Sequence, residues 1–190
     1  MTKDNYLKPF KDYVKEHYTS KDAAHNFEHI ERIINTSNKI IDYGVDEDID
    51  FYLLAFLQCF HGLSRKLETD SEFKRNTIDF LLGLGLSGEK ITIYFECLKR
   101  HCKSPQRIEE KIVHDSNFIE VVGSYGLARA FNSAGTRGQT IEEIIDILET
   151  HYYNMIECKT PFGKIVYNEK KKFAEDFLIL LKKEIDWYKE

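Results

Sequence analysis

A chain of 190 residues, 42% of them hydrophobic, can bury a sizeable core without disulfides or a structural metal, and its length suits one domain over residues 1–190. A net charge of −5 argues against a dedicated nucleic-acid-binding protein, which usually carries a basic face. The apolar runs are too short to span a bilayer, no signal peptide is evident and the four cysteines form no CxxC pair. We therefore expect no membrane partner, reduced cysteines and a cytoplasmic location.

The hydrophobic pattern has a period near 3.6 almost everywhere, and no sustained alternation suggests strands, so the fold class should be all-α. Thr140 and Glu143 form a capping box that starts one helix, and Trp187, near the end of the last, should pack into the core. The predicted helices span residues 4–18, 26–43, 47–62, 71–84, 88–102, 106–121, 124–133, 140–157 and 165–188.

Residues 22–34 place His25 and His29 four positions apart at the predicted start of an amphipathic helix. That spacing directs both imidazoles to one side, while the isoleucines at 30, 33 and 34 should face the core. Such a pair can bind a metal ion or a phosphate, although histidines so placed more often cap a helix or lie on the surface. The pair needs partners from elsewhere in the chain.

Two further stretches carry polar groups. Residues 51–63 are apolar on nearly all sides and should cross the centre of the fold, with His61 at the end as either a cap or a ligand. Residues 112–131 combine the run His114-Asp115-Ser116-Asn117 with a segment of small residues at 123–128 that lets helices approach closely.

In this order, the three stretches resemble the HD superfamily of metal-dependent phosphohydrolases, and specifically the small bacterial branch that includes nucleotide pyrophosphohydrolases. That branch carries a SHDxxHxxRV helix, an ALLHDxxDxK helix end and a DADRLDAIGAIGIARxF segment. The resemblance extends through His151-Tyr152-Tyr153 to the last helix and is strongest at residues 123–131. It implies a single-domain HD-type helical bundle that binds a nucleotide or another small phosphorylated ligand.

Carried over by position, the resemblance also implies roles for individual residues. Metal ligands would be His29 and His61, catalytic groups Asp115 and Lys66, and ligand-binding groups His25, Lys66 and Arg129. In such a site the cation polarises a phosphoryl oxygen and lowers the pKa of a bound water.

The chain departs from the family at two of its four metal-ligand positions. Gly62 replaces the aspartate of the HD doublet, and Asn117 replaces the last metal aspartate. Asn26 and Ser64 also stand where the branch has acids, so most of the negative charge is lost. Mg²⁺ and Mn²⁺ favour carboxylate oxygen, so we expect no tight binding of either at neutral pH and at most weak binding of Zn²⁺ or Ni²⁺ by His29 and His61.

Three functions remain open. The first is a divergent family member that binds a phosphorylated ligand, with hydrolysis weakened or lost. The second is an active phosphohydrolase with Asp115 or His114 as a replacement ligand, and the third is a helical scaffold for another protein. A shared ion would require the His29 and His61 rings to lie within about 10 Å of each other.

Other polar residues have simpler explanations. Cys97 and Cys102 are five positions apart and do not share a helical face well, so a soft-metal cluster with His101 is not expected. His17 and His151 should be structural or exposed, and Tyr125 and Tyr152 are more simply partly buried than ligand-binding. The sequence does not indicate an oligomeric state.

Overall fold

The computed structural model describes residues 3–21, 25–153 and 156–189, and within these residues the chain forms helices and no strand. This confirms the all-α class. None of the described helices combines the length and the apolar character needed to cross a bilayer. Contacts divide the chain into two units, Met1–His114 and Asp115–Glu190, so the single domain expected over residues 1–190 stays a prediction.

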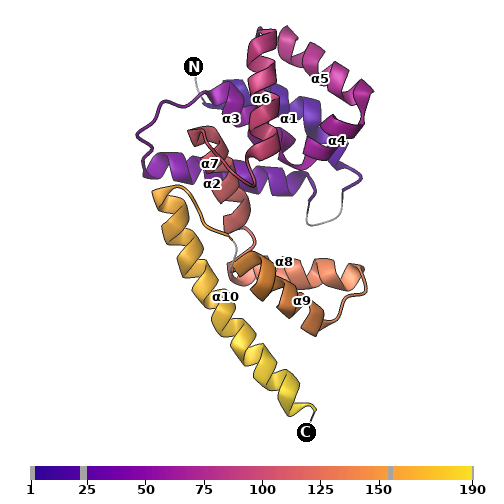
Figure 1. Ribbon diagram of the computed structural model, residues 1–190, viewed down its shortest axis with the longest axis vertical. Helices are drawn as coiled ribbons and strands as arrows, with labels where there is room; N and C mark the ends of the chain where they lie inside the picture. Colours follow the sequence, from indigo (N-terminus) through magenta and orange to yellow (C-terminus); the bar gives the residue numbers. More distant parts are fainter. Residues whose placement is uncertain (1–2, 22–24, 154–155, 190) are drawn as a thin grey trace. The chain divides into compact units, whose positions relative to one another are not determined.

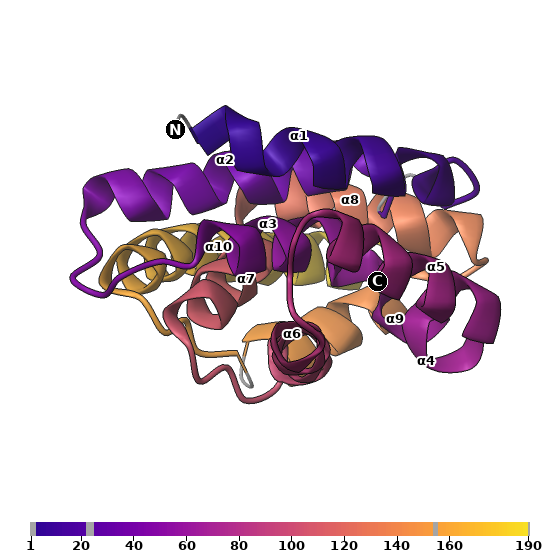
Figure 2. The ribbon, with the colours of Figure 1, turned by 90° about the horizontal axis from the view of Figure 1, so that it is seen from above.

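The first unit is a set of helices around α3. Its elements are α1 (Lys3–Val14), the 3-10 helix η1 (Lys15–Tyr18), α2 (Phe27–Tyr43), α3 (Phe51–Phe60), the 3-10 helix η2 (His61–Leu63), α4 (Ser64–Thr69), α5 (Ser71–Gly83), α6 (Gly88–Arg100) and the beginning of α7 (Ile108–Ile119). Helix α3 packs against α1, α2 and α6, and it lies between the first two and α6 (Figure 2).

Helix α3 is the centre of this unit because its side chains are buried on every side from Leu53 to Phe60. The carboxylate of Asp50 caps its start by accepting hydrogen bonds from the backbone N–H groups of residues 52 and 53. Phe56 stacks on Phe60 with ring centroids 4.6 Å apart. The prediction that residues 51–63 cross the centre of the fold is therefore confirmed for this unit, and the buried helix holds its C-terminal end in a defined place.

The second unit is built around the long helix α10. Its elements are the end of α7, α8 (Gly123–Thr136), α9 (Ile141–Ile147), the π-helix η3 (Leu148–Tyr153) and α10 (Pro161–Trp187). Helices α8 and α10 pack together, and α9 packs against α8 (Figure 1). The predicted capping box at Thr140 and Glu143 is present and starts α9.

Several predicted boundaries differ from the observed ones. Helix α4 was not predicted, and the helix expected over residues 140–157 is regular only to Ile147 before it widens into η3. Helix α10 begins at Pro161 rather than 165, because Thr160 caps it and proline suits the first helical position. The placement of Trp187 in the core is wrong, since its side chain is 70% exposed.

Candidate functional site

His29 lies in the first turn of α2, where its side chain is only 2% exposed. The helix begins at Phe27 because Asn26 caps it: the Asn26 side-chain oxygen accepts a hydrogen bond from the His29 backbone N–H at 3.3 Å. His25 therefore precedes the helix, and the prediction that α2 carries both histidines on one face is wrong. The two rings are nevertheless neighbours, with centroids 6.1 Å apart and His25 exposed to solvent.

His61 is the first residue of η2 and follows directly on the buried helix α3. Its ring centroid lies 5.5 Å from that of His29. This confirms that the two predicted metal histidines are within the separation of about 10 Å that one shared ion allows. The first two of the three stretches therefore meet at these imidazoles, and their roles as metal ligands stay predictions.

Gly62 lies against the side chain of Tyr18. A Cβ atom built on Gly62 would be 3.1 Å from both the Cε1 atom and the hydroxyl of Tyr18, which is closer than most real contacts. Tyr18 is 1% exposed, and its hydroxyl donates to the Cys59 carbonyl at 2.8 Å and accepts from the Gly62 N–H at 3.2 Å. Gly62 has no positive φ angle, so the neighbouring ring rather than the backbone conformation favours glycine here.

Two lysines lie near the turn that contains Gly62, and their ammonium groups contact different partners. The Lys66 ammonium is 3.2 Å from His17 Nδ1 and 4.7 Å from the centroid of the Phe73 ring, and no hydrogen bond joins it to His29 or His61 in the described residues. Burial lowers the pKa of His17, and the charge of Lys66 lowers it further. Lys21, which sequence reasoning missed, donates to the Gly62 carbonyl at 3.0 Å and is exposed.

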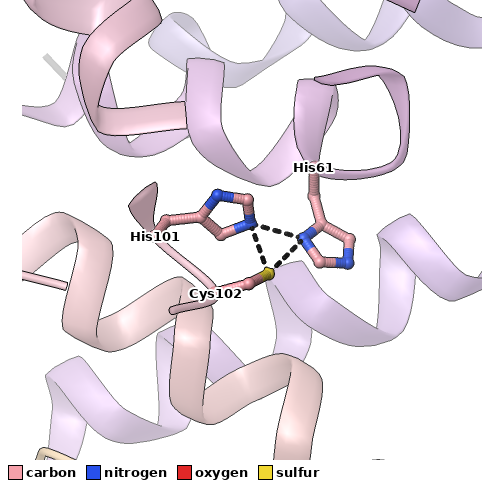
Figure 3. Close-up of side chains that lie close together, drawn as sticks. All are labelled: His61, His101 and Cys102. Atoms are coloured by element: carbon pink, nitrogen blue, oxygen red, sulfur yellow. Dashed lines mark hydrogen bonds between the residues drawn. The ribbon is translucent and has the colours of Figure 1, made fainter. Parts of the chain in front are cut away.

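His101 and Cys102 follow α6 and lie beside His61 (Figure 3). His61 Nδ1 is 2.7 Å from His101 Nε2, and the Cys102 sulfur is 3.0 Å from the same Nε2 atom and 3.9 Å from His61 Nδ1. The spacing of Cys97 and Cys102 argued against a cluster at this position, and Cys97 is not its third member. The true third member is 40 residues away, and no local spacing indicates it.

Burial favours the neutral forms of His101 and Cys102. The buried position of His101 lowers the pKa of its imidazole, against an opposing contribution from its hydrogen bond to the Leu98 carbonyl. Burial raises the pKa of the Cys102 thiol to about 12.

The donor atoms clustered at His61 do not fit Mg²⁺ or Mn²⁺. Among the described residues, the group of three side chains close enough to share an ion consists of His61, His101 and Cys102, and it contains no carboxylate. Mg²⁺ and Mn²⁺ prefer oxygen ligands, whereas imidazole and thiolate suit softer ions. The binding of the divalent metal that the family uses is therefore not supported by the residues around His61.

The other predicted site residues belong to the second unit. Asp115 is fully buried, and its carboxylate accepts hydrogen bonds from the backbone N–H groups of Lys159 and Thr160 and from the Thr160 hydroxyl, at 2.7 to 2.9 Å. Arg129 forms an ion pair with Glu120 at 3.0 Å. These contacts give both residues structural partners, and their catalytic and ligand-binding roles stay predictions, as does the role of Asn117. The motif His151-Tyr152 lies outside the residues whose side chains are described.

No model of a known protein family matches the chain. In sequence, it is 22% identical over 188 residues to the uncharacterized protein YpgQ of Bacillus subtilis, covering 91% of this chain and 90% of YpgQ. In structure, it resembles the Lin1889 protein of Listeria innocua, with a TM-score of 0.75, 22% identity and 98% of both chains covered. It also resembles an HD-superfamily hydrolase of Bacillus thuringiensis, with a TM-score of 0.75, 19% identity, and 97% and 99% of the two chains covered.

The chain has the fold of the HD superfamily. Within the HD fold, the observed elements around the first two motifs correspond to what the resemblance implies: a histidine at the start of α2 beside a histidine at the end of α3. The carboxylate that should follow the second histidine is absent, because residue 62 is glycine.

Proposed function

We propose that this protein binds a nucleotide or another small phosphorylated ligand at His25, His29 and His61, and that hydrolysis dependent on Mg²⁺ or Mn²⁺ is weakened or lost. The observation that carries the proposal is the pairing of His29 with His61 beside a glycine. Two imidazoles 5.5 Å apart can supply hydrogen bonds to a phosphate, while the carboxylate that would hold a hard cation is missing at position 62.

The cation for the phosphate would come from Lys21. Its ammonium lies at the turn after His61, whereas the ammonium of Lys66 contacts His17 and Phe73. An exposed lysine can leave a backbone carbonyl for a phosphate oxygen, because hydrogen bonds between charged groups are stronger than those to a neutral carbonyl. Lys66 and Arg129, to which the resemblance assigns ligand binding, remain candidates for further contacts with the phosphate.

A structural relative supports the class of ligand. Bacillus subtilis YpgQ has been crystallised in complex with ADP, and that structure matches this chain with a TM-score of 0.69 and 20% identity over 92% of this chain and 97% of YpgQ. A nucleoside diphosphate is therefore the first ligand to test.

The test is calorimetric titration of ADP into the protein in the presence of EDTA. We expect saturable binding without a metal, and a loss of affinity of about tenfold in Lys21→Ala and in His29→Gln, the size expected for one hydrogen bond to a charged group. Lys39→Ala changes an exposed lysine farther along α2 and is the matched control, with unchanged affinity expected. Release of phosphate from ATP with and without Mn²⁺ should stay close to background.

ADP binding that requires Mn²⁺, together with efficient hydrolysis of ATP, would instead establish the active phosphohydrolase. The structure does not favour this alternative, because the carboxylate of Asp115 already accepts hydrogen bonds from residues 159 and 160. If the protein did not bind ADP at all, the remaining hypothesis would be a helical scaffold that binds another protein. Its supporting observation is the set of exposed apolar side chains on α10: Ile165, Phe173, Ile179, Leu180 and Trp187.

A further inference from the structure

Three side chains meet beside α3. His61 belongs to the ligand set that the resemblance to the HD superfamily implies, and His101 and Cys102 lie outside that set. His61 comes from η2, and His101 and Cys102 come from the segment that follows α6. Their ligand atoms all lie within 4.8 Å of one another, and Figure 3 shows the two rings and the sulfur converging on one point.

The orientation of His101 is set by a partner outside the cluster. Its Nδ1 atom lies 2.6 Å from the Leu98 carbonyl oxygen, which can only accept a hydrogen bond, so Nδ1 carries a proton. In the neutral ring, the lone pair is then on Nε2, the atom that faces His61 and Cys102. A carbonyl that fixes the tautomer of a histidine in this way is a common feature of metal sites.

We propose that His61, His101 and Cys102 bind a Zn²⁺ ion, or another ion of similar softness, through Nδ1, Nε2 and Sγ. Two imidazoles and a thiolate are donors that Zn²⁺ prefers, and three protein ligands leave a fourth position open to water or to a ligand. The proposed site differs from the family's site in its donors and does not depend on the phosphate-binding proposal.

Binding requires a small outward movement of the rings. The separation of 2.7 Å between His61 Nδ1 and His101 Nε2 is that of a hydrogen bond, whereas two nitrogen ligands of one tetrahedral ion lie about 3.3 Å apart when each is about 2.0 Å from it. Without metal, the Nδ1 proton of His61 therefore points at His101. When the ion binds, His61 changes tautomer so that its proton is on Nε2, and the Cys102 thiol releases its proton to solvent. The net change is one proton released for each ion bound.

The experiment is a titration of the whole protein with Co²⁺, which substitutes for Zn²⁺ and is coloured. We expect one equivalent to produce an absorption band from charge transfer between thiolate and metal, with the release of about one proton, and Zn²⁺ should then displace the Co²⁺. Cys102→Ser should abolish the band. His101→Gln should weaken Zn²⁺ binding at least about 100-fold, since even the outer partners of metal ligands contribute about 10- to 100-fold. Cys97→Ala, which removes a buried thiol on the adjacent α6, is the matched control and should keep the band.

The wild-type spectrum and proton count do not depend on any variant folding, and thermal unfolding without metal shows whether each variant is folded. No thiolate band in the wild-type protein would overturn the proposal. It would also be overturned if Zn²⁺ bound Cys102→Ser with wild-type affinity, and loss of that binding in His29→Gln would then place the ion between His29 and His61. Neither result bears on metal-free binding of ADP, so the two proposals fail separately.

Discussion

Tyr18 limits which side chain residue 62 can carry, and residue 62 is the neighbour of His61 that could supply a metal-binding carboxylate. The tyrosine ring and hydroxyl approach the glycine so closely that a side chain can be added only if the ring moves, and that ring is buried and hydrogen-bonded. An aspartate at position 62 would therefore need Tyr18 to move.

The first prediction at this scale concerns Gly62→Asp. Alone, it should lower the free energy of unfolding by about 1–3 kcal/mol, the usual cost of forcing extra atoms into a packed region. Combined with Asn117→Asp, it should supply the two carboxylates that the resemblance assigns to the metal site and produce Mn²⁺ binding that we do not expect in the parent. Calorimetry with Mn²⁺, alongside thermal unfolding, measures both effects.

Asn117→Asp alone is the control for added charge. It should gain little affinity for Mn²⁺, because the carboxylate at position 62 is still missing. A double variant that is well folded and binds no Mn²⁺ would contradict the idea of a site lost by two substitutions. A parent that already hydrolyses phosphate esters as fast as the double variant would contradict the proposed loss of activity.

Single residues were predicted unevenly. The closeness of His29 and His61 followed from the order of two motifs, because the HD fold brings those motifs together. Lys21 and the pair His101-Cys102 could not be predicted in the same way. Their contacts join residues about 40 positions apart, and the direction of each side chain depends on turns at helix ends that periodicity does not describe.

At the scale of elements, the start of α10 depends on Asp115. Thr160 caps the helix through its hydroxyl oxygen, which accepts from the Gly163 N–H at 3.0 Å, and the same hydroxyl donates to Asp115 at 2.7 Å. A Cβ atom on Gly163 would be only 2.3 Å from the Asp115 carboxylate. A buried negative charge at this end also interacts favourably with the helix dipole.

We therefore predict that Asp115→Asn destabilises the protein by about 2–4 kcal/mol, since the donors on Lys159 and Thr160 lose a charged acceptor. Urea unfolding followed by circular dichroism measures this change. Asp176→Asn removes an exposed carboxylate of α10 that pairs with Lys172 and should change stability by less than about 0.5 kcal/mol. If Asp115→Asn unfolded like the parent and altered only a phosphohydrolase activity, the catalytic role implied by the resemblance would be the better explanation.

Most elements were predictable because their cores follow the helical period, and caps such as Thr140 with Glu143 can be read from local sequence. The change from α-helix to the π-helix η3 could not be predicted, because the hydrophobic pattern continues unbroken from Ile141 to Leu148. The early start of α10 has a local signal in Thr160-Pro161, because a capping threonine followed by proline is typical of a helix start.

For the whole molecule, tryptophan fluorescence reports on one place, because the chain has a single tryptophan. Trp187 is 70% exposed at the end of α10, with Tyr188 beside it at a ring separation of 5.0 Å. We predict emission typical of an indole in water and efficient quenching by acrylamide, with the Trp187→Phe variant as the blank.

Emission typical of a buried indole would contradict this exposure. If that emission shifted toward the water-like position on dilution, a second copy of the chain would be covering the end of α10, and sedimentation at the same concentrations would show the change in mass. The measurement thus also addresses the oligomeric state, which the sequence does not indicate.

The contact between Tyr18 and Gly62 also restricts the order in which substitutions can accumulate. An aspartate at position 62 would clash with the Tyr18 side chain. Replacing Tyr18 with a smaller residue would remove its two hydrogen bonds and leave a void beside Cys59. Each step alone is costly, and only the pair of changes relieves the crowding without the void. The two positions are therefore expected to vary together among related chains, and a route back to the HD doublet passes through a less stable intermediate whichever change comes first.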